Sequence, residues 1–537
     1  MEKIKIMKNI EFEKKQKIFL ILILFFYLIY CVNFIFKTSK VIDGKRYFVL
    51  FDDAMISMKY AKNFAEGYGL KWNKYEKPVE GYTNFLWTLY MTIPHFFKID
   101  LSKTSLFIQL SACIFLLLNG YIIFMISKKI FIDGKYILYI PLILTVTYLP
   151  LNYWSLFGME VSLLTLLINV IIFIFIYYIE NEKNILLLFI YLLLGLLILI
   201  RIDMIIYMIF FLCFNLFYDR KSFKNHIFLF IFTLIIFLGT QTVFRVFYYN
   251  DILPNTYYLK MTGYPILLRI LRGLYWLIYN LYRSNLILFI IPFLIFFLNI
   301  NDKRIYFLFF NFWIMCCYSV FVGGDAWEWW GGANRYYVIV IPSFFLVFVY
   351  TIKIIYDKLF IKRKIKNVLL ILTFILSIIL FNGFQGLDSI KMLILKKSAL
   401  YVDDQNPTEA LIIKEITNDK AILGIGPAGL VPYFSERDTI DFLGKNDKYI
   451  AKLKMETPDK KMNLIDKIKF FFPGHLKKDY NYSIIEKKPD ICIGCYSIQK
   501  ESIKKFLKEN YIPIKNRDIA LLKNSNNILW EKAKKYQ

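Results

Sequence analysis

The sequence predicts a multi-pass α-helical membrane protein of about eleven transmembrane helices, followed by a small α/β domain. Two observations predict this fold class. The chain of 537 residues is 58% hydrophobic with a mean hydropathy of +0.49, and its apolar residues gather in long runs, as in membrane helices. After residue 384, mixed-charge segments continue for about 150 residues, enough for one small domain. We therefore expect a transmembrane domain over 1–384 and a soluble α/β domain over 385–537.

Eleven apolar segments account for the predicted spans. They cover residues 18–36, 104–126, 135–153, 158–179, 184–200, 204–218, 226–244, 285–300, 304–322, 336–355 and 367–384. Several are shorter than the roughly 20 residues of a straight span, so their boundaries are soft. A twelfth apolar piece, 83–97, is shorter still and contains Pro94 and His95.

Basic residues set the predicted orientation. Six lysines precede the first span, which places the N-terminus in the cytoplasm as a retained signal anchor. The other basic links are 127–135, 180–183, 219–224, 301–304 and 356–366. All of them share the cytoplasmic side only if 83–97 does not cross. We therefore predict an interfacial or re-entrant helix at 83–97, a first outer loop over 37–103, and an extracytoplasmic C-terminus.

Charge and cysteine usage exclude some classes of function. The formal net charge of +26 would indicate a nucleic-acid partner in a soluble protein. In so apolar a chain it indicates membrane topology and contact with anionic lipids, so we expect no nucleic acid. Only three His are present, and Cys492 and Cys495 form a single CxxC, so no metal site is predicted.

Secondary-structure signals return in the residues after 384. "PTEALIIKEITN" and "ESIKKFLKEN" have helical patterns, whereas "AILGIG" and "TIDF" are strand-like. The GxGxxG pattern in "GIGPAG" follows a strand, but it is interrupted by a proline and lies in the predicted outer domain. We interpret it as a structural turn.

Two adjacent acids, Asp52 and Asp53, begin the polar stretch that follows the first span. One interpretation is structural, because helical spacing follows up to Gly67 and one Asp would cap that helix. The other is chemical, because a carboxylate facing a cavity can take the proton from an attacking hydroxyl. Two acids exceed what a cap needs, so we predict that Asp52 or Asp53 is a catalytic base.

A group of acids, amides and aromatic residues follows in "EKPVEGYTNFLW". The candidates for contact with a sugar are Glu80, Tyr82, Asn84 and Trp87. An aromatic belt at the membrane interface would also explain the rings. Such a belt does not call for Glu80 or Asn84, so we favour the sugar-binding interpretation.

Further charged and amide residues interrupt the predicted outer face. They are Arg201 with Asp203 at a helix end, Arg245, Asn255 and Lys260 in a predicted loop over 245–284, and Asp325 and Arg335 in the Gly- and Trp-rich loop 323–335. Each cation also suits a snorkelling anchor, and Arg201 also suits a pair with Asp203. Charged residues at membrane depth are costly, however, and together the cations suit a phosphate at the membrane surface.

These motifs resemble those of a known family. "DDAMISMKYAKNFAEGYGLKWN" with "VEGYTNFLW" is similar to the first outer loop of bacterial GT-C-type glycosyltransferases, including the mycobacterial terminal arabinofuranosyltransferase. Later motifs resemble the same group in the same order: "GME" (158–160), "RID" (201–203), "YYNDILPNTYYLK" (248–260), "GGD" with "NRYYVIVIP" (323–342), "GPAGLVPYFSERDTIDFLGKND" (426–447) and "PGHLKKD" (473–479). The resemblance runs from about residue 50 to 500. "RID" stands where relatives often have Arg-Pro-acid, which leaves specificity open.

The resemblance implies an inverting glycosyltransferase of the bacterial cytoplasmic membrane. It would move a sugar from a polyprenyl-phosphate carrier to an envelope glycan or glycolipid on the outer face. By resemblance, Asp52 or Asp53 supplies the base. The expected phosphate ligands are Arg201, Arg245, Lys260 and Arg335, and the expected substrate contacts are Glu80, Tyr82, Asn84, Trp87, Glu160, Asn255 and Asp325. No cofactor is required, although a divalent cation bridging carboxylate and phosphate is compatible.

Other functions stay open at this point. A lipid-linked sugar flippase or polysaccharide transporter would also be multi-pass, basic and lined with polar residues, but it needs neither paired acids nor a folded tail. An envelope scaffold would keep the tail without depending on Asp52 and Asp53. A GT-C enzyme that glycosylates protein is a nearer alternative.

Overall fold

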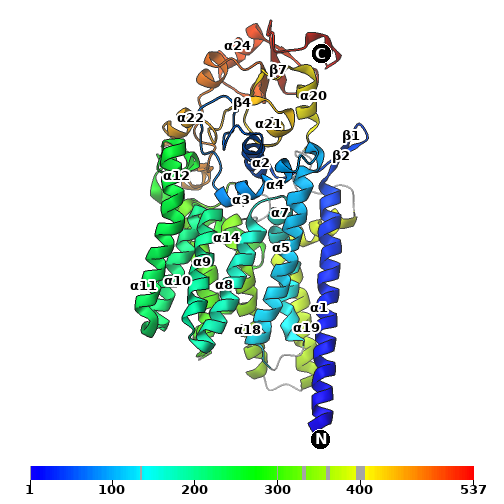
Figure 1. The fold of residues 1–537 in the computed structure, drawn as a ribbon, viewed down its shortest axis with the longest axis vertical. Helices are drawn as coiled ribbons and strands as arrows, with labels where there is room; N and C mark the ends of the chain where they lie inside the picture. Colours follow the sequence, from blue (N-terminus) through cyan, green and yellow to red (C-terminus); the bar gives the residue numbers. More distant parts are fainter. Residues whose placement is uncertain are drawn as a thin grey trace.

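The computed structural model describes residues 2–132, 136–298, 300–328, 334–358, 363–394 and 406–536. A bundle of long helices carries a smaller domain at one end, and the two chain termini lie at opposite ends of the molecule (Figure 1). Between these parts lie the short helices of the first loop, α2 (Asp52–Ala65), α3 (Phe85–Tyr90) and α4 (Ile93–Phe96). This middle layer contains the predicted acids and sugar-binding candidates.

Long apolar helices build the bundle. Among the described residues, six are long and apolar enough to cross a membrane. They are α1 (Glu2–Thr38, apolar from Lys14), α5 (Leu101–Ile130), α8 (Val161–Asn181), the continuous run of α11 (Phe223–Thr233), η4 (Leu234–Gly239) and α12 (Thr240–Tyr249), α16 (Lys303–Val322) and α19 (Arg363–Ile394). α19 extends past residue 384, so the predicted domain boundary falls inside this helix.

Bent and shorter helices complete the bundle. The number of spans rises to eight if each of two bent pairs counts as one. η1 (Ile137–Tyr139) and α6 (Ile140–Val146) bend by 50° into α7 (Leu149–Leu156), and α14 (Ile266–Arg283) bends by 109° into α15 (Leu286–Ile290) and η5 (Ile291–Phe296). α9 (Asn184–Ile200) and α10 (Ile205–Tyr218) are shorter, and α18 (Ile341–Lys358) ends in charged residues. The eleven predicted spans thus have helical counterparts, although length and apolarity alone support six to eight.

The predicted outer loop 245–284 is largely helical, which corrects the expectation of a loop. α12 runs to Tyr249, α13 covers Asn255–Met261, and α14 follows. α14 approaches α16 closely, because a Cβ on Gly273 would lie 2.4 Å from the Val320 carbonyl oxygen. Arginines interrupt the apolar residues of α14 in the sequence, so a helix was not predicted there. By contrast, α3 and α4 have six and four residues, too short to cross a bilayer.

A mixed five-stranded sheet forms the centre of the C-terminal domain. Its spatial order is β4 (Asp438–Asp441), β3 (Ile422–Ile425), β5 (Ile491–Ile493), β7 (Ile519–Leu522) and β6 (Tyr511–Pro513). β3 pairs in parallel with β4 and β5, whereas β7 is antiparallel to β5 and β6. The surrounding helices are α20 (Thr408–Ile416), α21 (Leu430–Ser435), α22 (Lys448–Lys452), α23 (Leu464–Phe470), α24 (Glu501–Asn510) and α25 (Trp530–Ala533). The predicted helical pieces correspond to α20 and α24, and the strand-like pieces to β3 and β4.

The first loop attaches the C-terminal domain to the bundle. The side-chain amide of Asn73 exchanges two 2.9 Å hydrogen bonds with the backbone of Thr439 in β4, so the first loop covers this edge of the sheet. Lys59 in α2 donates at 2.8 Å to the Arg437 carbonyl and lies over the ring of Trp72. These contacts fix β4 and the residue before it against the first loop.

Candidate active site

Asp52 and Asp53 occupy the first turn of α2, but they have different surroundings. Neither caps α2, whose N-cap residue is Phe51. The Asp52 carboxylate instead accepts the backbone N–H groups of Gly429 (3.1 Å) and Leu430 (2.9 Å), where α21 begins. Burial raises the pKa of Asp52 to about 6. Asp52 therefore joins the first loop to the C-terminal domain.

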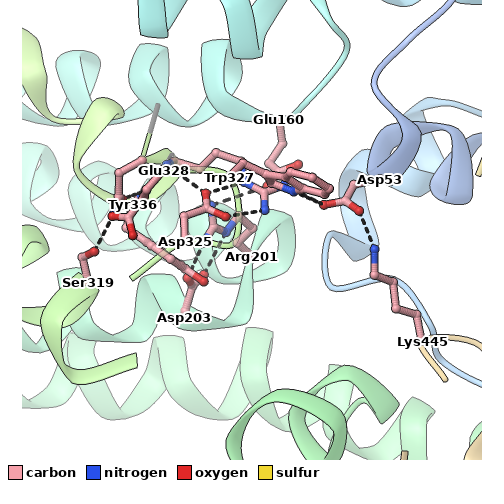
Figure 2. Close-up of polar contacts among 12 residues, drawn as sticks. Asp53, Glu160, Arg201, Asp203, Ser319, Asp325, Trp327, Glu328, Tyr336 and Lys445 are labelled. Atoms are coloured by element: carbon pink, nitrogen blue, oxygen red, sulfur yellow. Dashed lines mark hydrogen bonds and ion pairs between the residues drawn. The ribbon is translucent and has the colours of Figure 1, made fainter. Parts of the chain in front are cut away.

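Asp53 faces a cluster of cations. Its Oδ1 lies 2.6 Å from the ammonium of Lys445, and its Oδ2 lies 3.0 Å from the guanidinium of Arg335 (Figure 2). Trp327 donates its indole N–H to the same Oδ2 at 3.4 Å. Burial alone would raise the pKa of Asp53, but Lys445 and Arg335 outweigh it and hold that pKa well below its usual range. Both carboxylate oxygens are thus occupied.

Arg335 is held in place by a second acid. At the start of α17 (Arg335–Val338), its Nε and Nη2 donate to the two carboxylate oxygens of Asp325 at 2.7 and 2.8 Å. The guanidinium also lies 5.0 Å from the ring centre of Trp154. Bidentate pairing fixes the plane of the guanidinium, and Arg335 donates from its Nη1 to Asp53.

A second ion-pair group lies beside the first. Arg201, at the break between α9 and η2 (Ile202–Met204), pairs with Asp203, and its Nη1 lies 3.6 Å from Glu160 (Figure 2). The Asn84 amide donates to Glu160 at 3.0 Å and accepts from Ser57 at 2.8 Å. Asn84 and Glu160 therefore connect the first loop to the bundle at this site.

Lys260 is the least constrained cation of the site. It extends from α13 and makes no hydrogen bond or ion pair with the residues that the structure describes. Burial lowers its pKa to about 8, although the charge of Asp53 opposes the shift. An ammonium with free donors beside a cavity suits an anionic ligand.

These groups surround a pocket of about 80 Å³. Its lining is Asp53, Ile56, Ser57, Gly81, Tyr82, Thr83, Asn84, Met159, Glu160, Arg201, Thr256, Lys260, Arg335, Tyr336 and Lys445. The sequence had singled out Asp53, Tyr82, Asn84, Glu160, Arg201, Lys260 and Arg335 as candidates, and the fold brings them together here. They come from regions far apart in the chain.

Other predicted candidates lie outside this pocket. Glu80 and Arg245 form a buried bidentate pair, with N–O distances of 2.5 and 3.1 Å. The Asn255 amide donates to the carbonyls of Gly444 and Lys445, which fixes the loop that carries Lys445. Trp87 is fully buried, and its indole N–H donates to the Gly158 carbonyl. Asp325 contacts Arg335, and Asp52 contacts the start of α21.

Lys445, Tyr336 and Trp327 were not singled out from the sequence. Tyr336 lies under Arg201, with 5.2 Å between the guanidinium carbon and the ring centre. Lys445 is 392 residues from Asp53, so no local pattern could pair them. Its "LGKND" context after a predicted strand was the available signal. Within the described parts of the chain, no cluster of three or more His, Cys, Asp or Glu has the arrangement of a metal site.

Comparison with known proteins gives the fold and little more. Residues 399–531 match a family described as a domain of unknown function, DUF8728. No curated protein matches the sequence. The structure is similar to that of ArnT from Cupriavidus metallidurans, with a TM-score of 0.56 and 8% identity over 95% of this chain and 98% of ArnT.

This chain therefore has a fold like that of ArnT over nearly its whole length. The likeness agrees with a multi-pass membrane protein. At this level of identity it carries the architecture and not the substrate. The function of the site therefore depends on its own residues and not on the fold.

Proposed function

We propose that this protein is an inverting glycosyltransferase of the GT-C class. It transfers a sugar from a polyprenyl-phosphate carrier to an envelope glycan or glycolipid on the outer face of the bacterial cytoplasmic membrane. The observation that carries the proposal is the contact of Asp53 with Lys445 and Arg335, in a pocket that Lys260 and Arg201 also line. Such a site offers a base for a hydroxyl and cations for a phosphate.

The proposed reaction is a single displacement. The acceptor hydroxyl oxygen attacks the anomeric carbon and transfers its proton to Asp53. The bond between that carbon and the phosphate oxygen breaks, and polyprenyl phosphate leaves with the electron pair. Arg335, Lys260 and Lys445 stabilise its growing negative charge. Attack from the side opposite the phosphate inverts the anomeric configuration.

The resting ion pairs suggest how the base is activated. A carboxylate with cations on both oxygens is a weak base, because its charged form is already stabilised. A donor phosphate competes for the ammonium of Lys445 and the guanidinium of Arg335. Once these cations turn to the phosphate, Asp53 regains basicity. The base is then strong only when a donor is bound.

Donor entry must also enlarge the pocket. A cavity of about 80 Å³ holds a few water molecules, whereas ligand pockets commonly measure about 300–1,000 Å³. Lys445 lies on the segment between β4 and α22 and closes the pocket against Asp53. Movement of this side chain toward the phosphate would open space and release the base in one step.

The disulfide between Cys492 and Cys495 supports the proposed location of the C-terminal domain. Disulfides persist in oxidising compartments such as the bacterial periplasm or cell surface. A C-terminal domain outside the cytoplasm would also place Lys445 and the pocket there.

Reconstitution in liposomes tests the proposal. The purified chain is supplied with a panel of radiolabelled polyprenyl-phosphate sugars and with glycans and glycolipids extracted from bacterial envelopes. We expect labelled acceptor of inverted configuration, one polyprenyl phosphate released per transfer, and activity that survives EDTA. Passage of intact lipid-linked sugar across the bilayer would indicate a transporter, label on a peptide would indicate protein glycosylation, and loss with EDTA would assign a role to a divalent cation.

A further inference from the structure

A second, larger pocket of about 570 Å³ lies between the first loop and the C-terminal domain. Its lining includes the ends of α12 and α22, two helices that lie side by side (Figure 1). Its lining comes from residues 76–79, 248–250, 439–441 and 446–449, together with Tyr482 and Lys487.

The second pocket adjoins the active-site pocket across a thin wall. Lys445 lines the active-site pocket, and its neighbour Asn446 lines the second one. Gly81 backs onto this wall so closely that a Cβ there would lie 1.9 Å from Asn446 Oδ1. The two pockets are therefore separated by the chain at residues 445 and 446.

The carboxylates of the second pocket are already engaged within the protein. Asp441 accepts the backbone N–H groups of Leu443, Gly444 and Asn446. Asp447 accepts the N–H of Ile450 and the hydroxyl of Tyr482. These acids shape the loop after β4 and have little capacity left for a cationic ligand.

Two ammonium groups remain available there. Lys77 makes no hydrogen bond or ion pair with the described residues. Lys487 lies 5.3 Å from the ring centre of Tyr482 and pairs with no carboxylate in the described part of the chain. Glu76 already accepts from the Asn73 amide. The three carboxylates and three ammonium groups of the lining balance in formal charge. The ammonium groups of Lys77 and Lys487, however, keep donors that an acidic group on a ligand would use.

Aromatic rings line the same pocket. The rings of Tyr449 and Tyr482 lie 4.4 Å apart at 40°, and Tyr449 is 48% exposed. Rigid rings with polar tips provide apolar contact at little entropic cost, beside charged groups that fix orientation. Sugar rings have an apolar C–H face and a hydroxyl rim, which match this combination.

We propose that the second pocket binds an acidic saccharide, with its acidic groups on Lys77 and Lys487 and its sugar faces on Tyr449 and Tyr482. If the proposed function holds, this saccharide is part of the acceptor, and the wall at Asn446 separates its bound sugars from the donor site. The saccharide-binding assignment itself does not require that the protein be a transferase.

Binding to the full chain in nanodiscs tests this assignment. The probes are defined bacterial envelope oligosaccharides, both acidic and neutral, at low and at 0.5 M salt. We expect acidic oligosaccharides to bind best and to weaken with salt. Lys77→Ala and Tyr449→Ala should each weaken binding about tenfold or more, equivalent to about 1.4 kcal/mol. Both side chains are exposed, so neither change should affect folding.

A matched control and a second readout separate this inference from the proposed function. Tyr496→Ala removes another exposed tyrosine of the C-terminal domain, outside the pocket, and should leave binding unchanged. Binding that Lys77→Ala and Tyr449→Ala abolish, in a protein that uses no lipid-linked donor, would uphold the saccharide site and remove the transferase. No binding, equal binding of neutral sugars, or no effect of the two variants would overturn the inference.

Discussion

Replacement of each adjacent acid by asparagine distinguishes their functions. Asp53→Asn removes the proposed base while it keeps the size of the side chain, so transfer should fall by about 10²–10⁴-fold. This corresponds to about 2.7–5.5 kcal/mol in the activation barrier. Asp52→Asn keeps an amide oxygen that can accept the N–H groups of Gly429 and Leu430, and Asn is as good a cap as Asp. Its rate should stay within about fivefold of wild type, since a lost cap bond costs about 1 kcal/mol or less.

The stability of Asp53→Asn needs its own control. The change leaves the Lys445 ammonium, which is 9% exposed, without its carboxylate. Arg335 keeps Asp325, and the new amide still accepts one hydrogen bond. We therefore expect a loss of about 2–3 kcal/mol, the low end for a broken buried pair. Adding Lys445→Met removes the unpaired charge and should recover most of that loss, while transfer remains absent.

Transfer by purified protein in liposomes, normalised to folded protein from thermal melts, measures these effects. A folded Asp53→Asn protein with more than a tenth of wild-type activity would refute Asp53 as the base. If Asp52→Asn instead abolished transfer and melted normally, the base would be Asp52. Recovery of activity in the double variant would show that Asp53 serves only to neutralise Lys445.

Three further outcomes follow from the same ion pairs and from the predicted topology. Glu80→Gln should cost about 3 kcal/mol of stability by breaking the buried pair with Arg245, with little change in the turnover of folded protein, and a large loss of turnover there would contradict a structural role. The folded pKa of Asp53 is depressed, so its stabilising contribution is present above the unfolded pKa of about 3.9 and is lost as pH falls toward the folded pKa. Below pH 4 the melting temperature should therefore fall more steeply with pH for wild type than for Asp53→Asn. An equal fall in the two proteins would contradict this. A reporter inserted after residue 130 should be active in the cytoplasm and one at the C-terminus outside it, and a cytoplasmic C-terminus would put the pocket on the wrong face for the proposed donor.

Much of the bundle could be predicted because an apolar run of about 20 residues has few folded alternatives to a membrane helix. Prediction from the sequence was wrong where charged residues interrupt an apolar run. In α14, Arg269 and Arg272 broke the apolar run, so the segment was interpreted as a loop. In the fold both side chains are buried, and Arg269 donates to the Phe321 carbonyl near the end of α16. A helix that buries its arginines against backbone carbonyls has no simple hydropathy signature.

The candidate site was predictable only in part for a related reason. Polar residues in an apolar context stood out, which located Asp53, Arg201, Lys260 and Arg335. Whether such a residue faces a ligand or another side chain depends on contacts across the fold. Glu80 and Arg245 have the same local signals as pocket residues, yet they are 165 residues apart and satisfy each other. Composition therefore identifies the charged residues, and only the fold assigns their partners.

The C-terminal domain contributes more to the pocket than the sequence alone indicates. From the sequence it was a separate module that followed the last span. In the structure Asp52 caps its helix α21, the Asn73 side chain bonds to the edge of its sheet, and the loop after its strand β4 carries Lys445 to Asp53. The lysine comes from the region that matches the domain of unknown function, and the carboxylate comes from the first loop. Neither region alone contains the ion pair, so the pocket that Asp53 and Lys445 line exists only where the two meet.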